Sequence, residues 1–216
     1  MDKQSLILRI KKQKVKLILQ KLYKVYPNPR TALEYTNPLE LLVATILSAQ
    51  ATDKSVNIAS PALFKKYKTA KDYADSDLKE LDSYITNVNF HQNKAKLVKA
   101  MGKMLVEKFN GEVPDNMEDL DSLPGVARKT ANVVLGNAFK KAEGIVVDTH
   151  VMRLSQKLGL TKEKDPVKIE KDLMEVVPKD KWIDFAHLLI NYGREFCPAR
   201  PHVCKDCPLG NLCPDL

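Results

Sequence analysis

Four cysteines near the C-terminal end are the densest group of residues that could do chemistry. They are the only cysteines of the 216-residue chain and are spaced C-x6-C-x2-C-x5-C, at Cys197, Cys204, Cys207 and Cys213. Four thiolates in so short a segment are typical of a metal centre. Structural zinc usually shows two close cysteine pairs, whereas only one pair here is close, so the spacing favours an iron–sulfur cluster. Zinc and disulfide bonds are the alternatives.

A lysine lies at the start of an expected helix. Pro124 and Gly125 predict a tight turn between a short helix over 117–123 and a second helix that opens near Arg128. The first turn of a helix presents free N–H groups and a positive dipole end, which suit a phosphodiester. Positive potential also favours the neutral, nucleophilic form of an amine, so Lys129 is a candidate nucleophile. The alternative is a phosphate-binding or solvated lysine.

A carboxylate follows the strand-like run 145–147. Asp148 immediately precedes the helical positions Val151 and Leu154, and capping that helix is its simplest role. A capping carboxylate that faces Lys129 would also be able to take part in proton transfer.

Composition narrows the class of protein. Thirty-five basic and 27 acidic residues give a net charge of +8, which indicates an anionic partner such as nucleic acid, or else a lysine-rich solvated surface. The longest uncharged apolar stretch, 41–49, is far shorter than the roughly 20 residues that span a bilayer. The N-terminus also lacks the apolar core of a signal peptide. We therefore expect no membrane partner and a cytoplasmic protein.

Helical periodicity recurs along the chain, and only 8 residues are glycine. About ten helices are expected, with no run long enough for a sheet, so the predicted fold is all-α. Cap-plus-proline pairs are expected to begin helices at Asn37-Pro38, Ser60-Pro61 and Asp165-Pro166, and Asn110-Gly111 to end one.

Together these segments resemble the endonuclease III family, helix-hairpin-helix DNA glycosylases with a C-terminal [4Fe-4S] loop. Four segments carry the likeness in order: LSAQATD at 47–53, the turn and helix at 123–134, VDTH at 147–150, and the cysteine spacing. The likeness runs from about residue 15 to Cys213. It implies a [4Fe-4S] cluster held by the four cysteines.

The resemblance implies two helical domains with a DNA-binding cleft between them. Residues 31–141 are expected to form a six-helix domain that ends in the helix-hairpin-helix. Residues 1–30 and 142–216 are expected to form the iron–sulfur cluster domain. The implied partner is damaged double-stranded DNA. A monomer is the default expectation, in the cytoplasm and nucleoid-associated if the source is prokaryotic.

The implied activity is that of a bifunctional DNA glycosylase and AP lyase acting on oxidised pyrimidines. Lys129 would displace the base through a Schiff base and cut 3′ to the abasic site by β-elimination, with Asp148 assisting. Gln50 would fill the space of the extruded base, and Phe90 and His91 would lie in a loop that wedges the duplex. A polar helix end for Gln50 and a core position for Phe90 are the alternatives.

The resemblance also implies contacts to the DNA backbone. In the hairpin these come from Pro124, Gly125, Val126, Ala127 and Arg128. Ala127 stands where the hairpin commonly has glycine, which would cost about 1 kcal/mol if the position required a positive φ. Between the first two cysteines only Arg200 and His202 are basic, and Arg200 is the expected contact there.

Two other functions compete with this hypothesis. Related monofunctional mismatch glycosylases carry Ser or Tyr at the lysine position, so Lys129 argues against that activity. A DNA-binding module without catalysis would need neither Lys129 nor Asp148.

Overall fold

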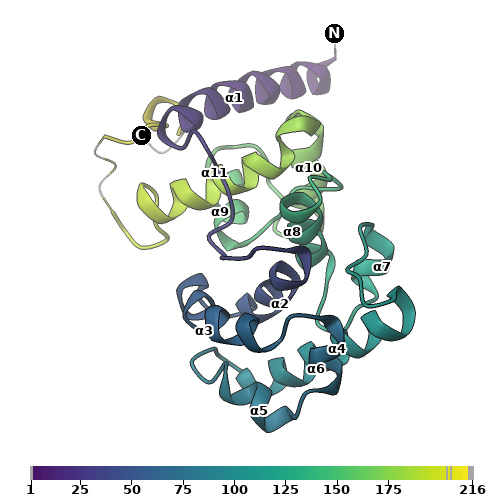
Figure 1. The fold of residues 1–216 in the computed structure, drawn as a ribbon. Coiled ribbons are helices and arrows are strands. Elements are labelled where there is room, and N and C mark those ends of the chain that lie inside the picture. Colours follow the sequence, from purple (N-terminus) through teal and green to yellow (C-terminus); the bar gives the residue numbers. More distant parts are fainter. Residues whose placement is uncertain (1, 203, 205, 214–216) are drawn as a thin grey trace. The chain divides into compact units, whose positions relative to one another are not determined.

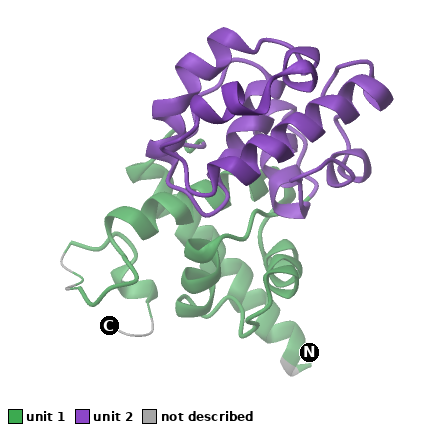
Figure 2. Ribbon diagram, turned by 90° about the horizontal axis from the view of Figure 1, so that it is seen from below, with its two compact units in different colours: residues 1–30, 144–216 green, residues 31–143 purple. Residues whose placement is uncertain are grey.

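The computed structural model describes residues 2–202, 204 and 206–213, and these form helices joined by turns and loops (Figure 1). No strand occurs in this part of the chain, including the strand-like run 145–147. None of the described helices is long and apolar enough to cross a membrane. The chain divides into two compact units, coloured separately in Figure 2: unit 1 comprises residues 1–30 and 144–216, and unit 2 comprises residues 31–143.

Unit 2 contains seven of the described α-helices and has α2 near its centre. Its helices are α2 (Pro38–Ser48), α3 (Asp53–Lys66), α4 (Ala70–Asp75), α5 (Leu78–Ser83), α6 (His91–Phe109), α7 (Met117–Asp121) and α8 (Arg128–Ala138). α2 packs against α3, α6 and α8, because seven successive residues from Leu41 to Leu47 are buried. Helix α4 and helix α5 cover α6, and α7 packs on α8.

Two of the expected helix signals in unit 2 are confirmed. The Asn37 side chain accepts a hydrogen bond from the Glu40 N–H at 2.9 Å, with Pro38 as the first helical residue. Asn110 and Gly111 adopt the left-handed region, and the Gly111 N–H donates to the Leu105 carbonyl at 2.8 Å. This arrangement closes α6 in the way a C-terminal glycine usually does.

The expected helix start at Ser60-Pro61 is wrong. Helix α3 begins at Asp53, capped by the Thr52 side chain, and runs through Pro61 to Lys66. The Ser60 hydroxyl donates backwards to the Val56 carbonyl at 2.8 Å, so it caps nothing. The earlier cap starts the helix, and the proline then removes only one internal hydrogen bond.

Unit 1 is built from both ends of the chain. Its helices are α1 (Lys3–Val25), α9 (Thr149–Lys157), α10 (Pro166–Val176), α11 (Trp182–Glu195) and the 3-10 turns η1 (Lys179–Lys181) and η2 (Gly210–Leu212). Both α10 and α11 pack against α1 and α9. The periodic face Val15, Ile18 and Leu22 of α1 is fully buried. Asp165 caps α10 ahead of Pro166, as the sequence predicts.

Candidate active site and cysteine centre

The turn between α7 and α8 requires glycine at position 125. Gly125 has φ of +78°, and a Cβ there would lie 3.3 Å from Leu97 Cβ and 3.4 Å from Ile46 Cγ2. Val126, 8 % exposed, anchors the turn in the core of unit 2. Helix α7 ends at Asp121, two residues before the expected end, ahead of the sterically restricted residue that precedes Pro124.

Ala127 is unstrained in this turn. It is the N-cap of α8 with φ of −119° and ψ of 168°, which is extended backbone that any residue adopts. The cost of about 1 kcal/mol that alanine would pay at a positive φ therefore does not apply to Ala127. The alanine side chain has no oxygen to cap the helix, so it leaves the first N–H groups of α8 without a side-chain acceptor.

Lys129 is the second residue of α8 and its side chain is exposed. Among the described residues of unit 2 it has no ion-pair or hydrogen-bond partner. The first turn of α8 contains no acidic residue. The amine therefore lies beside uncapped helix N–H groups with no counter-ion in its own unit, a setting suited to a phosphate or a reacting sugar.

Asp148 is the N-cap of α9 in unit 1, as the sequence predicts. Its Oδ1 accepts a hydrogen bond from the Val151 N–H at 2.8 Å, and the residue is half-buried. The second carboxylate oxygen accepts no hydrogen bond from the described residues of this unit. One oxygen thus holds the helix start while the other remains available.

Gln50, Phe90 and Gly125 line one pocket of about 430 Å³ in unit 2. Gln50 lies beyond the last residue of α2 with φ of 53°, and Phe90 precedes α6 with φ of 58°. Left-handed backbone is uncommon for residues other than glycine and marks both positions as constrained. Phe90 is 65 % exposed, so the alternative that it is a core residue is wrong.

Two residues that no sequence motif marks, Lys94 and Asn89, hold this pocket together. Lys94 is 4 % exposed, and its ammonium donates to the Leu47 carbonyl at 2.7 Å near the end of α2. Burial lowers the pKa of Lys94. The Asn89 side chain donates to the Gln50 carbonyl at 3.0 Å and so joins the two left-handed segments. No sequence signal singles out either residue, because lysine and asparagine are ordinarily solvated.

His91 is the first residue of α6 and is half-buried. Its Nδ1 lies 2.5 Å from Oδ1 of Asp82, the penultimate residue of α5. The His91 imidazole is therefore paired with a carboxylate of unit 2. This contact fixes the start of α6, next to Phe90.

All four cysteines are free of disulfide bonds. Cys197 and Cys213 are buried, and Cys204 and Cys207 are half-buried. Three of the sulfurs lie near Tyr192, whose hydroxyl oxygen is 3.1 Å from the Cys207 sulfur. Burial, this contact and the charges of Cys207, Cys197 and Cys213 raise the pKa of Tyr192. Within the described residues no group of three or more His, Cys, Asp or Glu side chains meets the geometry for a metal ion.

Basic side chains gather beside the first two cysteines. The Arg153 guanidinium donates to the Cys197 carbonyl at 2.5 Å and lies 3.6 Å from the Cys197 sulfur. Arg153 lines a pocket of about 500 Å³ together with Lys157, Arg200 and His202. Arg200, the expected phosphate contact, is exposed. Arg153 and Lys157 of α9 line the same pocket, and no local spacing in the sequence connects them to this loop.

Known proteins that are similar to this chain identify its family. Residues 43–179 match the HhH-GPD superfamily of base excision DNA repair proteins. The chain is also 50 % identical over 204 residues to endonuclease III of Synechocystis sp., which covers 94 % of this chain and 93 % of that protein. The chain belongs to the endonuclease III family. As a member of it, the protein is a bifunctional DNA glycosylase and AP lyase of base excision repair.

Solved structures of the endonuclease III family share this fold. A non-covalent endonuclease III–DNA complex matches with a TM-score of 0.89 at 41 % identity, over 94 % of this chain and 95 % of that one. A trapped endonuclease III–DNA covalent intermediate matches with the same score and identity, over 94 % and 96 %. The all-α fold predicted from the sequence is confirmed by the structure and by these matches.

Proposed function

We propose that this enzyme removes oxidised pyrimidines from damaged double-stranded DNA, with Lys129 as the nucleophile. The observation that carries the proposal is the exposed Lys129 amine at the uncapped start of α8, without a partner in its own unit. A nucleophilic amine must be accessible to the sugar and free of a counter-ion, and Lys129 meets both requirements within its own unit.

The chemistry proceeds in two stages. The neutral Lys129 amine attacks C1′ of the deoxyribose, the N-glycosidic bond breaks, and the base leaves with its electron pair and takes up a proton. Loss of the amine proton and ring opening produce a Schiff base between Lys129 and C1′. Removal of a C2′ proton then expels the 3′ phosphate, and water releases the lysine. The strand is cut on the 3′ side of the abasic site.

Asp148 serves this reaction through its second carboxylate oxygen. That oxygen would accept a proton or stabilise positive charge on the sugar, while Oδ1 keeps the start of α9 in place. The proposal requires Lys129 and Asp148 to reach the same deoxyribose.

The pocket of unit 2 would handle the duplex around the lesion. Phe90, exposed on constrained backbone, would wedge a base step, with His91 fixing the start of its helix. Gln50 would fill the space that the flipped nucleotide leaves. The N–H groups from Gly125 to Arg128 and the Arg200 side chain would hold phosphates.

We further propose that Cys197, Cys204, Cys207 and Cys213 hold a [4Fe-4S] cluster in unit 1. The donor set fits, because four free thiols is the number that such a cluster requires, and Tyr192 and Arg153 direct donor atoms to the sulfurs. When bound, the cluster would cross-link the segment after α11 and present Arg200. We expect the enzyme to act as a monomer. We expect it in the cytoplasm, associated with the nucleoid if the source is prokaryotic.

Borohydride trapping tests the nucleophile. Wild-type enzyme and Lys129→Gln are incubated with a duplex that carries one thymine glycol, and the Schiff base is reduced to a stable covalent complex. We expect a complex with wild type only, and retained DNA binding by the variant. Trapping by Lys129→Gln would overturn the assignment of Lys129. Alkali-labile sites without any complex would instead indicate a monofunctional glycosylase.

A further inference from the structure

The whole positive surplus of the chain lies on one helix. Helix α1 contains eight basic residues and no acidic residue, and the net charge of the chain is +8. The remainder of the chain therefore has 27 basic and 27 acidic residues and is neutral overall. Charge concentrated in this way attracts an anionic polymer to one face far more strongly than the same charge spread evenly.

Three of these cations form a row on α1. Arg9, Lys12 and Lys16 follow the i, i+3, i+7 spacing that places side chains on one face of a helix, and all three are exposed. None forms an ion pair or a hydrogen bond with a described residue. By contrast, Lys66 pairs with Glu80 at 2.6 Å on the surface of unit 2.

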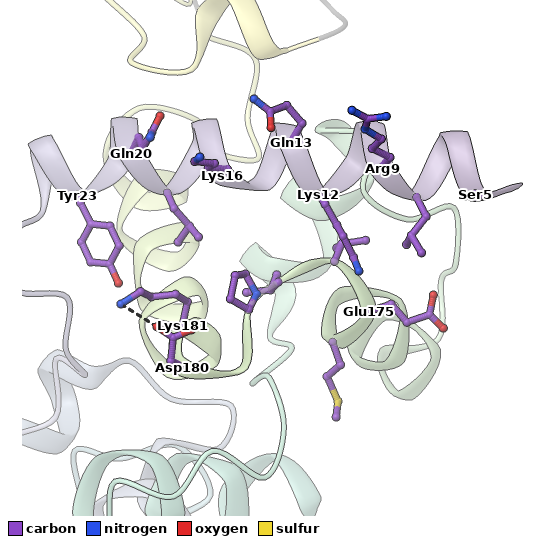
Figure 3. A pocket seen from close by; sticks show the side chains of 16 residues that line it. Ser5, Arg9, Lys12, Gln13, Lys16, Gln20, Tyr23, Glu175, Asp180 and Lys181 are labelled. Carbon is purple, nitrogen blue, oxygen red and sulfur yellow. Dashed lines mark ion pairs between the residues drawn. The ribbon is translucent and has the colours of Figure 1, made fainter. Parts of the chain in front are cut away.

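The row borders a groove of about 1030 Å³ between α1 and the segment that joins α10 to α11 (Figure 3). Figure 3 shows Lys12 extending from α1 into the groove, whereas the Arg9 side chain projects from the other side of the same helix. The groove has only two acidic lining residues, Glu175 and Asp180, and Asp180 is paired with Lys181 at 3.2 Å. The α1 edge of the groove is therefore left with uncompensated positive charge.

We propose that Arg9, Lys12 and Lys16 bind the phosphate backbone of duplex DNA, as a second contact that is independent of sequence. The inference rests on the proposed function, because it presupposes that DNA is the substrate. From Arg9 to Lys16 the row spans about 10 Å at 1.5 Å per residue, and each strand of a duplex carries one phosphate per about 3.4 Å of the duplex axis. A row that lies along that axis therefore covers roughly three phosphates of one strand. Flexible cations on a rigid helix hold phosphates without reading bases.

An anionic membrane would attract the same cations but fits this helix less well. A helix lying on a membrane inserts its apolar face, and the continuous apolar face of α1, with Val15, Ile18 and Leu22, is fully buried in unit 1. The apolar side chains in the first two-thirds of α1 that remain accessible are 36–58 % exposed: Leu6, Ile7, Ile10 and Leu17. These are partly covered and interspersed with cations, so we favour DNA.

Salt-dependent binding of an undamaged duplex tests the proposal. The variant Arg9→Gln/Lys12→Gln/Lys16→Gln is compared with a control of equal charge loss, Lys79→Gln/Lys103→Gln/Lys108→Gln, whose lysines are exposed on α5 and α6. Each lost phosphate contact lowers the slope of log K against log salt by about 0.9. We expect the α1 variant to lose two to three contacts, a slope change of about 2–3, and the control to change by less than about 1.

Two further measurements separate the outcomes. Single-turnover cleavage of the thymine glycol duplex at saturating enzyme should be equal in all three proteins. If wild type fails to cleave, the proposed function fails; if it cleaves but the α1 variant and the control have equal slopes, the α1 proposal fails. Sedimentation with phosphatidylglycerol vesicles that depends on the α1 cations, with an unchanged DNA slope, would assign the surface to a membrane and overturn the proposal.

Discussion

Lys129 and Asp148 both lie at helix starts, and the local backbone explains what each side chain is able to do. Lys129 lies in the first turn of α8, which the Ala127 side chain leaves uncapped. One carboxylate oxygen of Asp148 accepts a hydrogen bond from the Val151 N–H, and the other oxygen remains available. The difference matches their proposed roles, because a nucleophile must be unpaired while a proton-transfer group must be held in place.

Asp148→Asn separates capping from chemistry. Asparagine caps helices about as well as aspartate, so α9 and the free energy of unfolding should be nearly unchanged. Without the carboxylate, single-turnover base release should slow by about 10²–10⁴-fold. Measured base release close to the wild-type rate, in a variant of wild-type stability, would show that Asp148 is only a cap.

Gly125→Ala and Ala127→Gly form a matched pair in one turn. At position 125 a side chain meets both positive φ and two core atoms, so we expect a loss of about 1–2 kcal/mol in the free energy of unfolding. At position 127 the backbone is already extended, so glycine relieves no strain; its cost of about 0.4–1 kcal/mol through the unfolded chain is opposed by its better N-cap propensity, and we expect a net change below about 1 kcal/mol. Urea unfolding distinguishes the two, and a stabilisation by Ala127→Gly well above about 1 kcal/mol would contradict the unstrained backbone.

At the scale of elements, the end of α2 and the start of α6 are joined by the polar side chains of buried Lys94 and exposed Asn89. Lys94 donates to Leu47, and Asn89 donates to Gln50, so two helices and two left-handed residues share one small network. Asn89 lies 39 residues from Gln50 in the sequence and directly precedes Phe90. The network therefore explains how Gln50 and Phe90 come to line one pocket.

Lys94→Met should weaken this junction and change its pH dependence. The variant leaves the buried Leu47 carbonyl without its donor, at a cost of about 1–3 kcal/mol. Burial lowers the pKa of Lys94 in the folded state, so the unfolded chain binds more protons between that pKa and about pH 10. The free energy of unfolding of wild type should therefore rise with pH in this window relative to Lys94→Met.

Urea unfolding of both proteins at neutral pH and near pH 10 measures that difference. Lys103→Met, at an exposed position of the same helix, is the control and should show neither effect. An equal pH response of wild type and Lys94→Met would contradict a lowered pKa for Lys94.

At the scale of the whole molecule, the net positive charge and the cysteines both belong to unit 1. The eight cations of α1 and the four cysteines belong to residues 1–30 and 144–216, while unit 2 contributes the hairpin and the pocket. Unit 1 thus contains Asp148, the α1 cations and the proposed cluster ligands, while Lys129 and the hairpin belong to unit 2. Lys21 links the two features, since its ammonium donates to the Pro208 carbonyl at 3.2 Å.

Cys207→Ser tests the cluster. Cys207 contacts Tyr192 and is one of the four proposed ligands, so its loss should remove the visible absorbance of the protein and most of its soluble yield. Lys205 neighbours this residue in sequence and Lys205→Ser is a control that should keep both. A colourless wild-type protein that contains zinc and cleaves DNA would show that the centre is not an iron–sulfur cluster.

The sequence by itself determined the all-α fold, the helix starts at Asn37 and Asp165, the cap at Asp148 and the family, because these depend on local spacing and on short motifs. Local signals also misled, as at Ser60-Pro61, where the start of α3 at Thr52 prevails over a later proline. Only the tertiary structure decided that Phe90 is exposed, that Ala127 is unstrained and that Lys94 is buried at the pocket that Gln50 and Phe90 also line. Those facts depend on which helices pack together, and burial of a side chain is a property of its neighbours in space rather than in sequence.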